Sequence, residues 1–105
     1  MKLARFVAFM TVMVLGTAVC VHAQDDPASL YKSKCQVCHG PNGNGDTAAG
    51  KKLGAKDLHS PEVTKQSDAA LFDIVKKGKG KMPAYNGKLT DDQIKALVKY
   101  IRALK

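Results

Sequence analysis

The clearest hydrophobic pattern in the chain lies near its C-terminal end. Apolar residues recur there at helical spacing, with lysines between them. This pattern predicts an amphipathic helix with one buried face. The four residues 90–93 have the composition of a capping box, and Leu89 is placed to pack on Ile94 as a hydrophobic staple. The apolar positions are Ile94, Leu97, Val98, Ile101 and Leu104.

Two further helices are predicted by their end signals. Asp26 followed by Pro27 is typical of a helix start, and this helix should run toward Cys35. A second helix is expected over residues 68–77, capped by Ser67 or Asp68 and ended by a glycine. No run alternates over the length of a strand. The sequence therefore predicts an all-α domain with three main helices.

Glycine-rich stretches separate these predicted helices. Residues 40–54 contain several glycines together with Asn and Asp, and they are expected to form loop and turns. A shorter loop, residues 78–85, follows the second helix and contains Met82 and Pro83.

The first 23 residues have the layout of a secretory signal peptide. Lys2 and Arg5 precede an apolar run over residues 6–18, and Val21-His22-Ala23 resembles a cleavage site. Cleavage after Ala23 would leave residues 24–105 as one periplasmic or otherwise exported domain. An uncleaved anchor is less favoured, because a bilayer span needs about 20 apolar residues. Lipid attachment at Cys20 is disfavoured by the bulky Val19 before it.

Removal of this segment changes what the composition means. The whole chain has 105 residues, 17 Lys+Arg and 9 Asp+Glu. Without Lys2 and Arg5 there remain 15 basic residues against nine acidic ones, a formal charge of +6. A domain this short buries little surface and often recruits a cofactor. Despite the basic charge we expect no nucleic-acid partner, because the domain is predicted to be exported.

The residues Cys35-Gln36-Val37-Cys38-His39 form the pentapeptide C-x-x-C-H, the attachment signature of haem c. Two thiols three positions apart lie on one side of a helical turn, so both can bond to one porphyrin edge. His39 can then approach the iron from the proximal side. After signal removal Cys35 and Cys38 are the only cysteines, so no thiol is left for a disulfide.

Two other uses of the cysteines are less favoured. A dithiol redox site lacks the βαβ pattern that usually carries it. A zinc site would have only Cys35, Cys38, His39 and His59, and two adjacent residues do not readily reach one tetrahedral metal. Covalent attachment of one haem is the favoured interpretation.

Met82 is the favoured sixth ligand of the iron. It is the single methionine left after signal removal, and a Met/His pair is a usual arrangement in electron-transfer haem proteins. Pro83 restricts Met82 to an extended backbone and stiffens the loop. His59, Lys79 and Lys81 remain alternative ligands, although His59 lies in a polar stretch that is expected to face solvent.

A cluster of lysines precedes Met82. These positive charges can stabilise the end of the second helix, and they can also steer an acidic redox partner to the haem edge. The cluster consists of Lys76, Lys77, Lys79 and Lys81.

Taken together, these features resemble a class I cytochrome c of the small bacterial kind. The resemblance rests on Tyr31 four residues before the first cysteine, on CQVCH, on KMPAY around Met82, and on a C-terminal amphipathic helix with Tyr100. It covers nearly all of residues 24–105. It implies a fold in which the terminal helices cross near one covalent haem, with His39 and Met82 as axial ligands.

The resemblance also implies a function. We expect a soluble monomeric one-electron shuttle, not an enzyme, that meets redox proteins through an acidic docking surface on the partner and does not insert stably into membranes. The alternative is an open-iron haem protein with a peroxidase or gas-binding role. That role needs distal acid–base groups, and Arg102 is the only arginine outside the signal segment.

Two positions depart from the family pattern. Pro27 stands where the family often has a small residue, commonly glycine, so Ala28 is expected to make the close contact between helices. The family often supplies a proline whose carbonyl accepts the ring N–H of the proximal histidine. No proline lies within residues 55–58, so another main-chain carbonyl would have to take this role.

Overall fold

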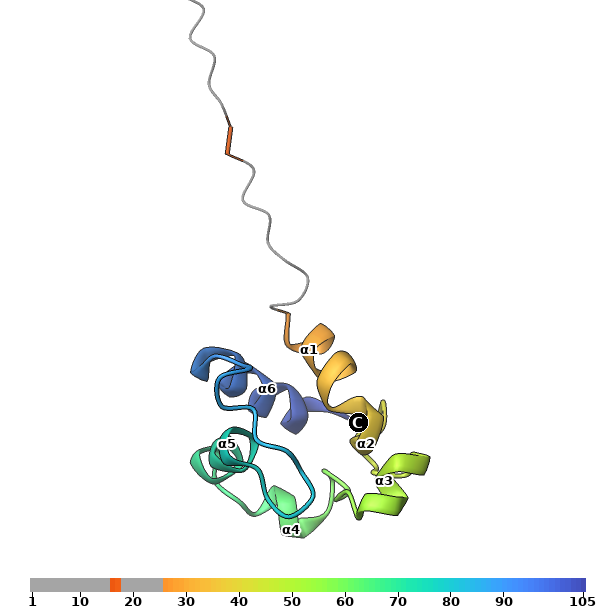
Figure 1. The fold of residues 1–105 in the computed structure, drawn as a ribbon. Coiled ribbons are helices and arrows are strands. Elements are labelled where there is room, and N and C mark those ends of the chain that lie inside the picture. The colour runs from red at the N-terminus through yellow and green to blue at the C-terminus, as the bar shows by residue number, and fades with distance from the viewer. Residues whose placement is uncertain (1–15, 18–25) are drawn as a thin grey trace, which may run out of the picture.

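The computed structural model describes residues 16–17 and 26–105, and within them the chain is built from helices (Figure 1). They are α1 (Pro27–Lys34), α2 (Gln36–His39), α3 (Ala48–Leu53), α4 (Pro61–Thr64), α5 (Asp68–Lys77) and α6 (Asp91–Ala103). Within the described residues only two isolated β-bridges occur, and no strand. The predicted all-α class is confirmed. The predicted signal peptide and its cleavage site lie, apart from residues 16 and 17, outside the described residues.

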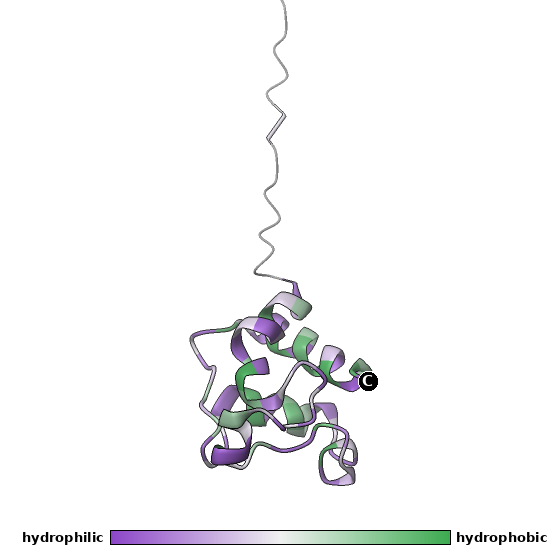
Figure 2. Cartoon of the chain, turned by 90° about the vertical axis from the view of Figure 1, so that its right-hand side faces the viewer, coloured by the Kyte–Doolittle hydropathy of each residue, from purple (hydrophilic) through white to green (hydrophobic). Residues whose placement is uncertain are grey.

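The core forms where α1, α5 and α6 meet. Ile94 and Leu97 on α6 are completely buried, and they pack with Leu30 and Tyr31 of α1 and with Val75 of α5. Figure 2 shows both hydrophobic and hydrophilic residues along the helices of the domain, and α5 and α6 are amphipathic. The stripe seen in the sequence is therefore the buried face of α6.

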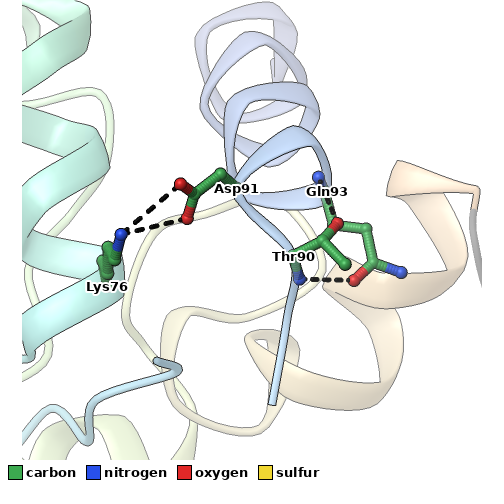
Figure 3. A network of polar contacts seen from close by, with 4 residues as sticks. All are labelled: Lys76, Thr90, Asp91 and Gln93. Atoms are coloured by element: carbon green, nitrogen blue, oxygen red, sulfur yellow. Dashed lines mark hydrogen bonds and ion pairs between the residues drawn. The ribbon is translucent and has the colours of Figure 1, made fainter. Parts of the chain in front are cut away.

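The start of α6 is stabilised by the predicted capping box. The Gln93 N–H donates to Thr90 Oγ1 at 3.1 Å, and the Thr90 N–H donates to Gln93 Oε1 at 2.8 Å (Figure 3). Next to it, Lys76 of α5 pairs with Asp91 at 3.1 Å, which links the two helices. The predicted start of the C-terminal helix is confirmed.

The prediction for residues 40–54 was wrong in part, because α3 lies inside this stretch. Thr47 caps α3 by accepting a hydrogen bond from the Gly50 N–H at 2.9 Å, and Gly54 ends it in a left-handed conformation with φ of 70°. Apart from Gly50, the residues between these ends are Ala, Lys and Leu, all good helix formers. The density of glycines concealed this short helix.

The single turn α4 was also not predicted, although a helix-start signal is present. Ser60 is its N-cap residue and Pro61 its first residue.

No helix in the described part of the chain is both long enough and apolar enough to cross a bilayer.

Candidate haem-attachment site

Cys35 lies at a break between two helices. Helix α1 ends at Lys34, and the N–H groups of Cys38 and His39 both donate to the Cys35 carbonyl, at 3.2 and 2.9 Å. Cys35, Cys38 and His39 therefore occupy one tight turn, with the two thiols i and i+3 on one side. Both thiols are free and half-buried. Two unpaired thiols at this spacing fit covalent attachment to one porphyrin edge.

The environment of Cys35 does not favour the two alternative uses of the cysteines. Burial, and secondarily the neighbouring Cys38, raise the pKa of the Cys35 thiol to about 11. A reactive redox dithiol needs the opposite shift, toward a lower pKa. Among the described residues no group of three or more His, Cys, Asp or Glu side chains is arranged to hold a metal ion.

The His39 ring is oriented by a main-chain carbonyl. Its Nδ1 lies 3.0 Å from the Lys56 carbonyl oxygen. A carbonyl can only accept, so Nδ1 carries the proton and donates. In a neutral ring the other nitrogen, Nε2, then carries the lone pair that can bind a metal. Lys56 lies within the stretch that contains no proline, and its carbonyl takes the role that the family often gives to a proline.

Residues of the glycine-rich segment 40–54 also contact the backbone of the attachment motif. Thr47 Oγ1 lies 2.7 Å from the Val37 carbonyl, to which it donates, and 3.2 Å from the Cys38 carbonyl. Gly50 packs so closely that an added Cβ would collide with the Cys38 carbonyl oxygen. Sequence reasoning missed Thr47 and Gly50, although a threonine at the start of a helix is a recognisable cap signal.

Tyr31 connects α1 to Gly40, the residue that directly follows the attachment motif. Its hydroxyl donates to the Gly40 carbonyl at 2.6 Å, and its side chain is 1% exposed. The ring also packs on Tyr100 of α6, with centroids 5.3 Å apart. Burial is the main reason why the pKa of Tyr31 is raised to about 12, with smaller contributions from Cys35 and Tyr100. Tyr31 thus joins α1, α6 and the residue that follows His39.

Met82 lies in a tight turn after α5. The Met82 N–H donates to the Lys79 carbonyl at 2.9 Å, and the Lys79 N–H donates to the Met82 carbonyl at 3.1 Å. Gly78, with φ of +76°, packs against this turn so closely that a Cβ would lie 2.7 Å from the Met82 carbonyl oxygen. The Met82 side chain is half-buried and packs against the same core cluster as Cys35.

The alternative ligands have different surroundings. His59 is exposed, as expected, and its Nε2 lies 2.6 Å from the Asn42 carbonyl oxygen. Lys79 and Lys81 are also exposed. Of the four candidates, Met82 is half-buried and packs against the core cluster, whereas the other three are exposed.

The lysine cluster divides into two parts. Lys76 is half-buried, paired with Asp91, and lies 5.6 Å from the centroid of the Phe72 ring. Lys77, Lys79 and Lys81 are exposed and form no ion pair within the described residues. These three make up the exposed lysine patch. Its charges are available to a partner.

Comparison with known proteins gives a consistent result. Residues 22–101 match the family model described as cytochrome c oxidase, cbb3-type, subunit III. Among curated relatives, the cytochrome c6 of Microcystis aeruginosa is 36% identical over 78 residues, covering 74% of this chain and 93% of that protein. The cbb3-type oxidase subunit CcoP of Azospirillum brasilense is 33% identical over 84 residues. This match covers 78% of this chain and only 28% of CcoP.

Solved structures give the same fold. The KustC0563 c-type cytochrome is 35% identical with a TM-score of 0.69, over 76% of this chain and 98% of that one. Cytochrome c6C from Synechococcus sp. PCC 7002 is 30% identical with a TM-score of 0.57, over 72% and 89% of the two chains.

Proposed function

The chain belongs to the class I c-type cytochromes, in the family of the cbb3-type oxidase subunit III, and from this premise we propose that it is a soluble, exported one-electron shuttle. Members of this family carry covalently bound haem c, and this chain carries one. The proposal depends most on the C-x-x-C-H turn, where two free thiols stand beside a histidine whose Nδ1 is already hydrogen-bonded.

Within the proposal each site residue has one role. Cys35 and Cys38 would hold the haem through thioether bonds, and His39 Nε2 and the Met82 sulfur would bind its iron. The haem supplies the one-electron couple, while the protein supplies position. The Lys56 carbonyl orients the His39 ring, and the turn between Lys79 and Met82 orients the methionine. Such supporting hydrogen bonds commonly tune the strength of a ligand.

Two protein ligands leave no position at the iron for a substrate, which favours a carrier over an enzyme. The open-iron alternative would need a polar distal group. Arg102 is engaged elsewhere, because it donates to Asp68 and to the Gln66 carbonyl, each at 2.5 Å. The alignment covers 93% of the cytochrome c6 of Microcystis aeruginosa, so a carrier of similar size is supported. It covers 28% of CcoP, so no role in an oxidase is proposed.

The partner is proposed to be a redox protein with an acidic surface, met by the cytochrome as a monomer. The exposed lysine patch supplies the complementary charge, which would steer the encounter and raise its rate. Export is proposed from the signal-peptide layout of residues 1–23, which places the protein in the periplasm or an equivalent compartment.

The test of this function has two parts. The purified protein should stain for haem on a denaturing gel, and the double variant Cys35→Ser, Cys38→Ser should not. The wild type should then give one reversible one-electron wave in voltammetry. Failure of the stain would exclude haem c. Carbon monoxide binding to the reduced protein at neutral pH would instead support the open-iron alternative.

A further inference from the structure

Tyr85 joins two segments that lie far apart in the chain. Its hydroxyl donates a hydrogen bond to the Lys34 carbonyl at 2.9 Å, across 51 positions of sequence. Lys34 is the last residue of α1 and directly precedes Cys35. Tyr85 lies three positions after Met82. One side chain therefore connects the loop of the proposed sixth ligand to the start of the attachment motif.

The Lys34 carbonyl is available because the helix breaks at this point. In a continuous helix it would accept from the Cys38 N–H, but that group donates to the Cys35 carbonyl instead, at 3.2 Å. Carbonyls at a helix end lack partners within the helix and are satisfied from outside. Tyr85 supplies this outside partner.

The main chain of Tyr85 is itself firmly held. Its N–H donates to the Val75 carbonyl of α5 at 3.1 Å, and its own carbonyl accepts from the N–H groups of Lys88 and Leu89, both at 3.0 Å. The side chain is half-buried against the core cluster. The backbone of Tyr85, just after the Met82 turn, is therefore held in place, and its hydroxyl extends from there to the end of α1.

We propose that Tyr85 is a positioning residue that latches the Met82 loop to the end of α1 and slows the departure of the Met82 sulfur from the iron. The latch rests on the proposed function, because it requires Met82 to be the sixth ligand. The loop must move for the sulfur to leave, and the hydroxyl bond to Lys34 opposes that movement. Phenylalanine would fill the same space without making the bond.

The experiment measures how fast an external ligand replaces Met82. Cyanide binds the oxidised iron only at a vacated position, so at saturating cyanide the rate reports loop opening. Wild type is compared with Tyr85→Phe and with two matched hydroxyl deletions. In Tyr100→Phe the lost hydroxyl makes no hydrogen bond within the described residues. In Tyr31→Phe the lost bond to the Gly40 carbonyl lies outside the Met82 loop.

The latch predicts that Tyr85→Phe binds cyanide about three to ten times faster than wild type, the effect of one hydrogen bond. Tyr100→Phe should stay within about twofold of wild type, and Tyr31→Phe should accelerate less than Tyr85→Phe even if it lowers the unfolding midpoint more. A rate for Tyr85→Phe within twofold of wild type would overturn the latch. Equal acceleration by Tyr31→Phe would also overturn it, because general loosening would then explain the effect.

A far-red absorption band of the oxidised protein arises from sulfur bound to iron. In the wild type this band tests ligation by Met82 separately from the Tyr85 latch. If the band is present and the rates do not differ, only the latch fails. If the band is absent, Met82 ligation fails and the latch fails with it.

Discussion

The His39 ring and the Lys56 carbonyl are joined by a hydrogen bond of 3.0 Å between residues 17 positions apart. The bond determines which ring nitrogen is free to bind iron. It is made by the main chain, so the identity of residue 56 matters less than the path of the backbone through it.

Lys56→Ala should therefore leave the haem site unchanged. The Lys56 side chain forms only an exposed pair with Glu62, at 3.3 Å, and such pairs contribute about 0–1 kcal/mol. We expect a midpoint potential equal to that of the wild type and a free energy of unfolding lowered by less than about 1 kcal/mol. Voltammetry and denaturant titration check both. A clear shift in potential would mean that the charged side chain, and not the carbonyl, acts on His39.

Gly50→Ala should lower both the stability of the protein and its haem loading, although alanine is the better helix former. Glycine to alanine inside a helix normally stabilises by about 0.5–1 kcal/mol. Here the new Cβ would collide with the Cys38 carbonyl, and displacement of that backbone should cost about 1–3 kcal/mol and lower the yield of haem-loaded protein. Denaturant titration and the haem absorbance per protein measure the two effects.

Gly54→Ala is the matched control for this substitution. Gly54 has φ of +70°, and no atom lies within 4 Å of the place that a Cβ would take, so its variant carries backbone strain without a collision. The free energy of unfolding of Gly54→Ala should fall by about 1–2 kcal/mol, and this variant should attach haem normally. A Gly50→Ala protein as stable as wild type would contradict the close contact with Cys38.

The stability of the protein should fall in strongly alkaline solution, partly because of Tyr31. Burial raises the pKa of its hydroxyl from the ordinary value of 10.0 to about 12 in the folded state. Between these values the unfolded chain releases the proton first, so the folded state loses stability as pH rises. Below pH 10 Tyr31 is protonated in both states, so its full contribution to the stability of the folded state is present.

Denaturant midpoints of wild type and Tyr31→Phe at pH 8 and pH 11 test this. The wild type should lose more stability between the two pH values than the variant does. Some decline should remain in the variant, since burial also raises the pKa of Tyr85. Identical declines in both proteins would show that Tyr31 does not titrate as its burial implies.

The exposed lysine patch should control association with an acidic surface. An electrode coated with a carboxylate-terminated monolayer serves as a defined acidic partner. Lys79→Glu with Lys81→Glu should weaken the voltammetric response on it, and the wild-type response should fall as salt is raised. Lys95→Glu with Lys99→Glu on α6 makes the same change in net charge elsewhere. Equal losses in both double variants would indicate that only net charge matters.

Local signals were enough to predict α1, α5 and α6. A proline at the first position starts α1, Ser67 caps α5 by accepting from the Ala70 N–H at 3.1 Å, and Thr90 opens the capping box of α6. The attachment motif is likewise contiguous in sequence. These features could be recognised because the residues that define them lie within a few positions of one another.

The supporting contacts of the site could not be predicted in this way. The Lys56 carbonyl at His39, the Tyr85 hydroxyl at Lys34 and the contact of Gly50 with Cys38 all join distant positions. Each of them uses a main-chain carbonyl, which every residue has, so residue type carries no signal for the acceptor. The family resemblance indicated that a main-chain carbonyl would meet the His39 ring, but only the folded arrangement identifies Lys56 and the other partners.

The absorption spectrum of the oxidised protein at neutral pH tests the central claim most directly. That claim is one haem c held by Cys35 and Cys38 with His39 and Met82 as axial ligands. We expect a weak far-red band from sulfur bound to iron in the wild type, and its loss together with a lower midpoint potential in Met82→Ala. A wild-type spectrum without this band, or a band that survives in Met82→Ala, would contradict ligation by Met82.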